Sequence, residues 1–241
     1  MSSHAKLFAL QHVYKRFGTT IALRDISFDL AAGECVALLG GNGAGKTTLL
    51  RILATLSRPT RGSVCAFNVD AWTARREIRQ RIGVVAHQPY IYPELSCREN
   101  LGFCATMFNV HDPRAAIERA LQVVGLTQRA DARASTMSRG LLQRLSLARA
   151  ILHEPAVLVL DEPDTGLDTH GRELLGALIA AQTARGASVV LTSHATVFAV
   201  ACASRVVLLE RGAIVLDAAA DARLVVEVDA AIGAAGALAG A

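Results

Sequence analysis

A glycine-rich segment between an apolar run and a helix-forming run constrains the fold of this chain most. Residues 40–47 read GGNGAGKT, with the spacing G-x-x-x-x-G-K-T, and they follow the apolar residues 35–39. The glycines let successive backbone N–H groups turn toward an anion, and the helix expected from Lys46 onward adds its positive dipole end. The alternative, a merely structural glycine-rich turn, does not explain the strand before it and the helix after it. The segment therefore predicts an α/β fold with a phosphate-binding loop.

The side chains of this loop are candidate nucleotide ligands. Lys46 supplies a positive charge for the β- and γ-phosphates, and the hydroxyl of Thr47 is a candidate ligand of Mg²⁺. The predicted nucleotide-binding residues of the loop are Gly40, Gly41, Asn42, Gly43, Ala44, Gly45, Lys46, Thr47 and Thr48.

A second apolar run ends abruptly in two acids. Residues 156–160 read AVLVL, and Asp161 and Glu162 follow directly. Such a run is typical of a buried parallel strand, and ligands of open α/β sheets bind at the carboxyl edge of the strands. A solvated pair of loop acids is the alternative, but a buried strand has no structural use for adjacent acids at its end. We therefore expect both carboxylates to serve the bound phosphate.

The segment before that strand predicts an amphipathic helix that begins at Ser138. The sequence SRGLLQRLSLARA places Leu142, Leu145, Ala148 and Leu152 along one side. Ser138 is a good N-cap residue, and a helix N-terminus also attracts anions through the same free N–H groups. Capping alone and anion binding are both open as roles for Ser138.

These motifs, in this order, resemble an ATP-binding cassette ATPase, the motor subunit of an ABC transporter. The phosphate loop, MSRGL at 137–141, LVLDEP at 158–163 and TGLD at 165–168 carry the resemblance, which covers about residues 6–217. It implies an α/β P-loop NTPase with a RecA-like core, an N-terminal antiparallel β subdomain and a helical signature subdomain. The implied ATPase domain is 1–217, with core and β subdomain at about 6–87 and 154–217, and the helical subdomain at about 88–153.

The resemblance also implies roles around the γ-phosphate of ATP. Asp161 would hold Mg²⁺, through water, and Glu162 would act as the general base that polarises the attacking water. Gln88 matches the glutamine that contacts Mg²⁺ and links to the partner protein. His194 matches the switch histidine that touches the γ-phosphate, although a lone histidine at a strand end is more often a core or surface residue.

In the family, part of each site comes from a second copy of the ATPase. Ser138, Gly140 and Asp168 would act on the ATP of the neighbour, so the resemblance implies a homodimer. Three positions depart from the common LSGGQ spelling: Met137, Arg139 and Leu141. The retained serine and glycine are those that supply a hydroxyl and allow close backbone approach, so we expect a working site.

Aromatic residues indicate two further contacts. Phe17 aligns with the aromatic that stacks on adenine, with Tyr14 as the competing candidate and a core position as the alternative for either. Tyr90, Ile91 and Tyr92 form an apolar tip after Gln88, on the surface that receives the membrane subunit in this family. A self-packed loop is the alternative.

Composition limits the remaining possibilities. The chain has 241 residues, 52% of them hydrophobic, so it can bury a full core. No run reaches the roughly 18 apolar residues that span a bilayer, so the transport path is expected in a separate permease. No secretory signal is evident at the N-terminus. We expect a peripheral protein on the cytoplasmic face of the membrane. Scattered cysteines without a C-x-x-C pair indicate reduced thiols: Cys35, Cys65, Cys97, Cys104 and Cys202.

The charge pattern does not favour nucleic acid as a partner. The net charge is only +4, and the arginines that crowd one segment are more simply a solvated helix face than an anionic-lipid or nucleic-acid surface: Arg75, Arg76, Arg79 and Arg81. Aromatic residues for base stacking are scarce there, apart from Trp72.

Finer features point to a subtype. The sequence of residues 49–64, 83–108 and 137–155 is similar to that of ATPase subunits of the haem-exporter type, which act in c-type cytochrome assembly. Drug and lipid exporter ATPases share much of this wording and are the alternative, followed by a soluble non-transport ABC ATPase. A P-loop kinase or GTPase lacks the signature helix and the switch histidine. Residues 218–241, rich in Ala and Gly, are expected to form one short strand or helix and then a frayed end.

Overall fold

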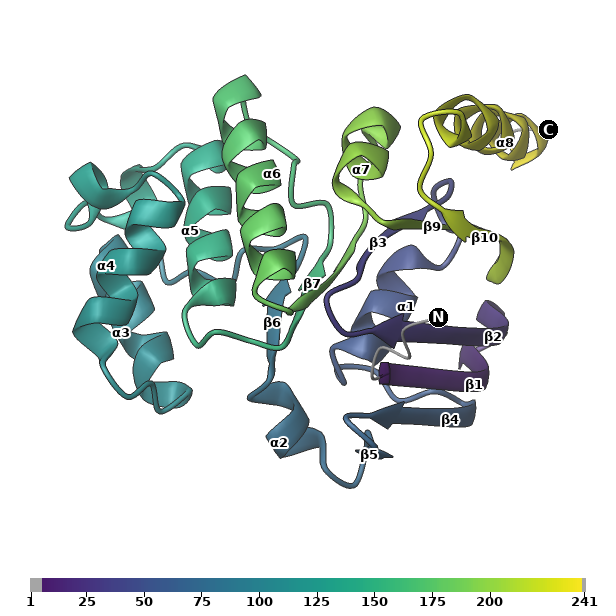
Figure 1. Ribbon diagram of the computed structural model, residues 1–241, viewed down its shortest axis with the longest axis horizontal. Helices are drawn as coiled ribbons and strands as arrows, with labels where there is room; N and C mark the ends of the chain where they lie inside the picture. The colour runs from purple at the N-terminus through teal and green to yellow at the C-terminus, as the bar shows by residue number, and fades with distance from the viewer. Residues whose placement is uncertain (1–5, 240–241) are drawn as a thin grey trace.

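A six-stranded sheet forms the centre of the molecule (Figure 1). The computed structural model describes residues 6–239, and the side chains of residues 6–233. The sheet order is β10 (Ala213–Ala219), β9 (Arg205–Glu210), β3 (Cys35–Leu39), β8 (Ser188–Leu191), β7 (Val157–Leu160) and β6 (Ile82–Val85). All neighbours are parallel except β10 and β9. The two apolar runs 35–39 and 156–160 thus become the buried parallel strands β3 and β7, as predicted.

The sheet register brings the predicted site residues to one edge. Val85 pairs with Leu160, and Leu160 pairs with Leu191, so β6, β7 and β8 end side by side. Leu191 also pairs with Ala37 of β3. The chain segments that follow these four strands therefore leave the sheet at the same edge, as expected for a ligand site in an open α/β sheet.

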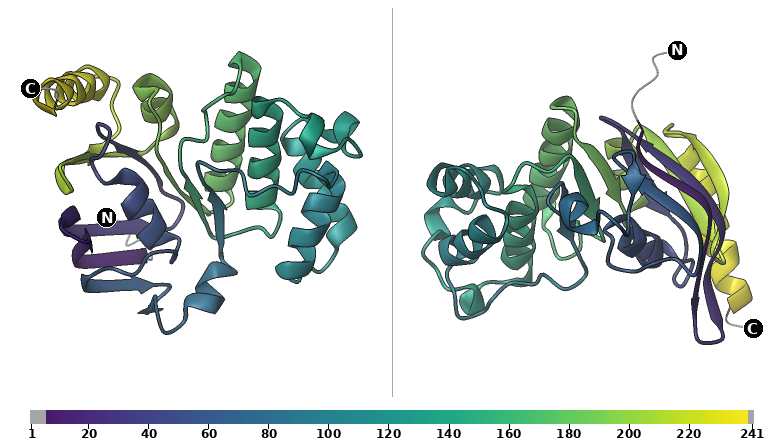
Figure 2. Two further views of the ribbon diagram at one scale, coloured as in Figure 1. Left: turned by 180° about the vertical axis from the view of Figure 1, so that it is seen from behind. Right: turned by 90° about the horizontal axis from the view of Figure 1, so that it is seen from below.

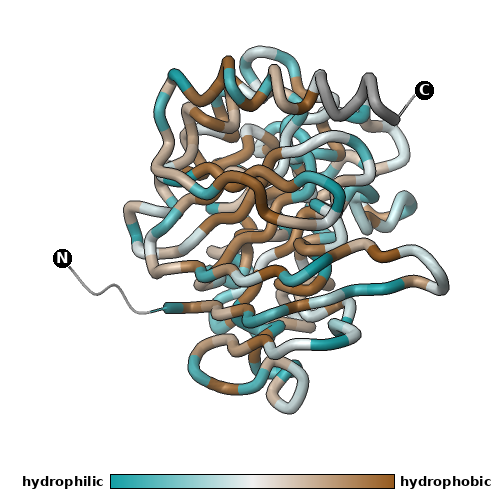
Figure 3. Tube along the Cα trace, turned by 90° about the vertical axis from the view of Figure 1, so that its right-hand side faces the viewer, coloured by the Kyte–Doolittle hydropathy of each residue, from teal (hydrophilic) through white to brown (hydrophobic). Residues whose placement is uncertain are grey.

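Two separate apolar cores lie on the two faces of this sheet. Leu158 and Leu160 of β7 face a core formed with α5 (Arg139–Ile151), α6 (Thr169–Ala184) and α7 (Thr196–Cys202). Val157 and Val159 face the other core, which includes α1 (Lys46–Leu53). The alternation follows from the two-residue period of a strand. Figure 3 shows the resulting concentration of hydrophobic chain at the centre of the molecule.

A four-stranded sheet covers the α1 side. Its order is β2 (Thr20–Ala31), β1 (Lys6–Phe17), β4 (Arg61–Ala66) and β5 (Val69–Asp70), and its pairs are antiparallel. The short helix α2 (Arg75–Arg79) then leads into β6. The predicted N-terminal antiparallel β segment is confirmed.

The helical block lies at the opposite end of the molecule from the antiparallel sheet (Figures 1 and 2). It contains α3 (Cys97–Met107), α4 (Pro113–Val123), two short 3₁₀ turns (Thr127–Arg129 and Ala134–Thr136) and α5. Ser96 and Glu99 form a reciprocal capping box at the start of α3: the Ser96 hydroxyl accepts the Glu99 N–H at 3.2 Å, and the Glu99 carboxylate accepts the Ser96 N–H at 2.8 Å.

The C-terminal segment is more ordered than expected. Instead of one short element, β10 continues to Ala219 and the helix α8 (Leu224–Ala239) follows. Alanine is the strongest helix former, so a segment poor in large side chains still forms a helix when one face finds a core. Val228 is fully buried in the core formed with α5, α6 and α7. The Thr196 hydroxyl donates a hydrogen bond to the Asp229 carboxylate at 2.5 Å. Residues 240–241 lie outside the described part of the chain.

No helix within residues 6–239 has the length and apolar content that crossing a bilayer requires.

Candidate nucleotide site

The phosphate loop joins the end of β3 to the start of α1, as the spacing predicted. Gly45 is the N-cap of α1 with φ 107°, a conformation that residues with a side chain rarely adopt. A Cβ on Gly45 would lie 2.6 Å from the carbonyl oxygen of Ala22. The loop therefore needs glycine at this position because β2 approaches its backbone closely.

Lys46 lies folded back on the loop that precedes it. Its ammonium donates hydrogen bonds to the carbonyl oxygens of Gly40 at 2.6 Å and Gly41 at 3.0 Å. Burial lowers the pKa of Lys46, and the negative charges of Glu162 and Asp161 partly oppose that shift. The lysine and both acids therefore share one electrostatic environment, although they are more than a hundred residues apart in sequence.

Asp161 meets the start of α1. The Thr47 hydroxyl lies 3.4 Å from the Asp161 carboxylate, and the Thr192 hydroxyl donates to the same carboxylate oxygen at 2.9 Å. The structure thus brings together Thr47 and Asp161, two of the three residues predicted to contact Mg²⁺. Thr192, which follows β8, was not predicted. Its only signal in the sequence is its place at the end of the apolar run before His194.

Glu162 lies between two histidines. Its carboxylate is 2.9 Å from Nε2 of His194 and 3.9 Å from Nδ1 of His87. The Glu162 N–H donates to the Thr192 hydroxyl at 2.9 Å. The predicted pair Glu162 and His194 is therefore in direct contact. His87 was missed as a site residue, and its adjacency to Gln88 was the available signal.

Gln88 is exposed and lines a cavity of about 310 Å³ at this edge of the sheet. Thr47, His87 and Asp161 line the same cavity. Gln88 therefore shares a cavity with Thr47 and Asp161, and its side chain makes no hydrogen bond among the described residues.

Ser138, Gly140 and Asp168 lie apart from the phosphate loop of their own chain. The Ser138 hydroxyl accepts the Leu141 N–H at 3.4 Å, which makes it the N-cap of α5. Asp168 caps α6 by accepting the Gly171 N–H at 2.7 Å. That bond, aided by the charge of Arg144, lowers the pKa of Asp168. In the described residues, no hydrogen bond joins this group to residues 40–48.

Both aromatic candidates for adenine stacking are accessible. Phe17 is 50% exposed at the end of β1, and the Lys15 ammonium lies 4.8 Å from its ring centroid. Tyr14 is 37% exposed. Phe17 is therefore the more exposed of the two rings, and Tyr14 also stays a candidate for stacking on adenine.

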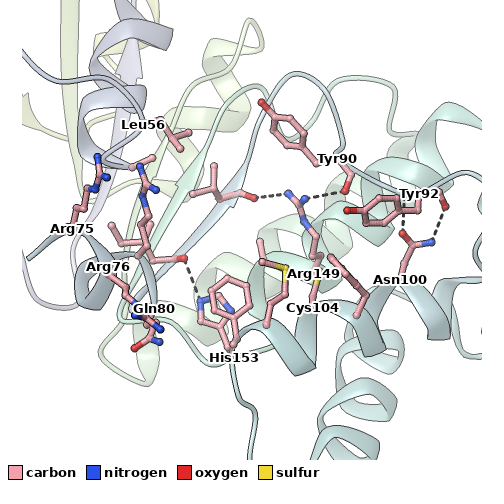
Figure 4. Close-up of a pocket in the computed structure, with 18 residues that line it drawn as sticks. Leu56, Arg75, Arg76, Gln80, Tyr90, Tyr92, Asn100, Cys104, Arg149 and His153 are labelled. Atoms are coloured by element: carbon pink, nitrogen blue, oxygen red, sulfur yellow. Dashed lines mark hydrogen bonds between the residues drawn. The ribbon is translucent and has the colours of Figure 1, made fainter.

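A second, larger cavity of about 740 Å³ opens between α2 and the helical block (Figure 4). Arg75 and Arg76 lie along one wall, and Tyr92 lies along the other, where its ring meets Phe103 edge-on at 5.1 Å. Arg149 lies between the walls and donates to the carbonyl oxygens of Val84 and Tyr90 at 3.0 and 3.1 Å.

The predicted apolar tip divides in this structure. Tyr90 and Tyr92 are exposed, whereas Ile91 is half-buried against the core formed with α5, α6 and α7. Two of the four crowded arginines make contacts within the protein. Arg79 donates hydrogen bonds to the backbone carbonyl and the hydroxyl of Thr55, and the Arg81 guanidinium lies 3.7 Å from the ring centroid of Phe67.

Comparison with known proteins decides the family. The family model described as ABC transporter matches residues 23–165. The chain is a member of the ABC transporter family. This ABC ATPase is 38% identical to the Nod factor export ATP-binding protein I of Bradyrhizobium diazoefficiens (strain USDA 110). The 212 matched residues cover 87% of this chain and 69% of that relative. The protein of the same name from Rhizobium meliloti (strain 1021) is 38% identical over 202 residues, 83% of this chain and 60% of the relative.

Solved structures confirm the P-loop NTPase fold of this ABC ATPase. An ATP-binding subunit of an ABC transporter matches with a TM-score of 0.81 and 27% identity, over 88% of this chain and 90% of the other. A dimeric ATP-binding cassette in a post-hydrolysis state with ADP and Pi matches with a TM-score of 0.81 and 26% identity, over 89% and 99%. The chain is thus an ATP-hydrolysing subunit of an ABC transport complex.

Proposed function

We propose that this chain powers an export-type ABC transporter through an ATP site made from Lys46, Thr47, Asp161, Glu162 and His194. The observation that carries the proposal is their convergence at one sheet edge, where Glu162 lies 2.9 Å from His194 and Asp161 lies 3.4 Å from Thr47. These five side chains come from three distant parts of the sequence. A purely structural cluster would not need a lysine, two acids and a histidine around a phosphate-binding loop.

The donor set at Thr47 and Asp161 fits Mg²⁺. A hydroxyl and a carboxylate are hard oxygen ligands, and Mg²⁺ in nucleotide sites takes one or two protein oxygens together with phosphate oxygens and waters. Gln88 lines the same cavity and adds an amide oxygen. When bound, the ion neutralises charge on the phosphates.

Catalysis by these residues is positioning and electrostatics. Glu162 accepts a hydrogen bond from the attacking water and draws its proton, and His194 holds the Glu162 carboxylate through the 2.9 Å contact. Lys46 exchanges its two carbonyl partners for the phosphates, where its charge stabilises the transferring phosphoryl group. Phe17, or Tyr14 beside it, stacks on adenine.

A second copy completes each site in this proposal. Ser138, Gly140 and Asp168 do not serve the phosphate loop of their own chain, and Ser138 begins a helix whose N-terminal N–H groups suit an anion. The dimeric cassette among the similar structures supports a homodimer with this arrangement.

The larger cavity is the proposed docking site of an integral membrane permease. It combines aromatic side chains, Tyr92 and Phe103 among them, with the cationic wall of Arg75 and Arg76, and no acidic side chain of the described residues lines it. A helical segment with apolar and acidic residues would complement both walls. We therefore propose that the ATPase lies at the cytoplasmic face of the membrane.

The relatives named for Nod factor export support an export direction. The haem-exporter subtype of c-type cytochrome assembly, carried by motif wording alone, stays a prediction, as do drug or lipid export. Cargo recognition belongs to the permease in each case.

The experiment that tests the site is Glu162→Gln. Because a neutral amide does not draw the water proton, we expect ATP turnover to fall about a hundredfold or more, while ATP binding measured by calorimetry stays within a few-fold. Size-exclusion chromatography should show an ATP-dependent dimer. The matched control is Glu173→Gln, an exposed acid of α6. Turnover at the wild-type rate in Glu162→Gln would remove Glu162 from this role.

A further inference from the structure

Glu162 has an unusual backbone conformation. Its φ is 51°, in the left-handed region that side-chain-bearing residues rarely occupy. Such conformations persist only when the surrounding structure holds them. The direction of the Glu162 carboxylate toward His194 depends on this conformation, so the groups that hold the backbone also aim the carboxylate.

Two side chains hold this backbone from opposite sides. The Thr192 hydroxyl accepts the Glu162 N–H at 2.9 Å. Gln143, from α5, donates its side-chain amide to the carbonyl oxygen of Pro163 at 3.1 Å and makes a longer contact of 3.4 Å with the Glu162 carbonyl oxygen. An amide nitrogen carries two hydrogens, so it can serve both carbonyls at once. Gln143 is buried and uncharged.

Close packing puts Gln143 in reach of the turn. A Cβ on Gly140 would lie 2.7 Å from the Gly166 carbonyl oxygen, so the first turn of α5 rests directly on the backbone that follows Glu162. The stem of Arg139 covers Gly166, where a Cβ would lie 3.2 Å from the Arg139 Cγ. Gln143 comes three residues after Gly140, on the same side of the helix, and projects toward Pro163.

We propose that Gln143 is a positioning residue for ATP hydrolysis: its amide fixes the Glu162–Pro163 backbone in the conformation that aims the Glu162 carboxylate. Gln143 touches neither nucleotide nor water and acts only through Glu162. The inference rests on the proposed role of Glu162 as general base. Since Ser138 is the N-cap of α5, the same amide links the helix end proposed to face the neighbour's ATP with the carboxylate of its own site.

The test is Gln143→Met, which keeps the length and burial of the side chain and removes the amide. We expect kcat for ATP to fall about tenfold, the scale of one lost hydrogen bond with its unsatisfied carbonyl. We expect the KM for ATP to stay within twofold and the melting temperature to change little. Gln143→Asn, which keeps the amide but shortens its reach, should lose kcat in the same way. Gln122→Met on the exposed side of α4 is the matched control.

A double-mutant cycle separates positioning from a general structural role. In the Glu162→Gln background, Gln143→Met should slow the residual turnover no further, because its effect passes through Glu162. An unchanged kcat in Gln143→Met, an added loss in the double variant, or a joint loss of ATP affinity and melting temperature would each overturn the inference. If Glu162→Gln itself turns over normally, the proposed role of Glu162 fails instead.

Discussion

His153 is a half-buried imidazole on the wall of the larger cavity, away from the nucleotide site. Its ring stacks on Phe108, with centroids 3.8 Å apart and planes 5° from parallel, and its Nε2 lies 3.2 Å from the Ile82 carbonyl oxygen. Its buried Nδ1 has no hydrogen-bond partner among the described residues. Burial lowers the pKa of His153 to about 4, because a charged ring would lose its hydration there.

This pKa predicts a loss of stability in mild acid. Below pH 6.5 an unfolded histidine takes up a proton that folded His153 refuses until about pH 4, so the free energy of unfolding falls as pH is lowered through this window. The contribution of this group is on the order of 3 kcal/mol at most. Urea unfolding of His153→Phe, which keeps the ring stack, should show a flatter dependence from pH 6.5 to 4. An equal slope in wild type and variant would contradict this, and exposed His111→Phe is the control.

At the scale of residues, the sequence indicated which charged side chains would converge at the edge of the sheet. It did not indicate which residues hold those side chains in place by hydrogen bonds. Lys46 was indicated by the G-x-x-x-x-G-K-T spacing, and Glu162 by the abrupt end of the apolar run 156–160 in two acids. Thr192 and Gln143 were not, because their contacts depend on strand register and on how closely α5 packs on the turn after β7. The positive φ of Glu162 likewise has no signature in the sequence.

Elements with strong local signals were predicted, and elements that depend on tertiary burial were not. Ser138, a good N-cap residue, marked the start of α5, and the spacing around Lys46 marked the start of α1. The length of α8 escaped prediction because its sequence shows no clear apolar periodicity. Among its described side chains, residues 224–233, Val228 alone is fully buried.

Two valines of α8 test that attachment. Val228 is 0% exposed and Val226 is 74% exposed, in the same helix. We expect Val228→Ala to lower the free energy of unfolding by about 2 kcal/mol, because two buried methyl groups are lost. Val226→Ala should be close to neutral. The measurement is urea unfolding at pH 7. Equal effects would show that α8 lies outside the cooperative unit of the fold.

At the scale of the whole molecule, the cavity between α2 and the helical block is the proposed permease site. Phe103 on its wall and Val123 on α4 are 44% and 43% exposed, which makes them a matched pair. Phe103→Ser should reduce the share of the chain retained on washed membranes that contain its own permease, by roughly tenfold or more in affinity. Val123→Ser should not.

Equal retention of the two variants would argue against this cavity as the docking site. Absence of the wild-type chain from such membranes would instead favour the soluble class of ABC ATPases. Both variants should hydrolyse ATP in solution like wild type, since neither residue lies at the nucleotide site.

The four residues of β7 divide the two cores, and the strand ends at Asp161. Because β7 packs against both cores, a change of packing in either core can shift this strand. Side chains on the helical face and on the α1 face therefore both influence where the Asp161 carboxylate stands, without touching it. Selection on that one carboxylate would thus constrain both interiors, so compensating substitutions for a damaged site are to be sought on either side of this strand.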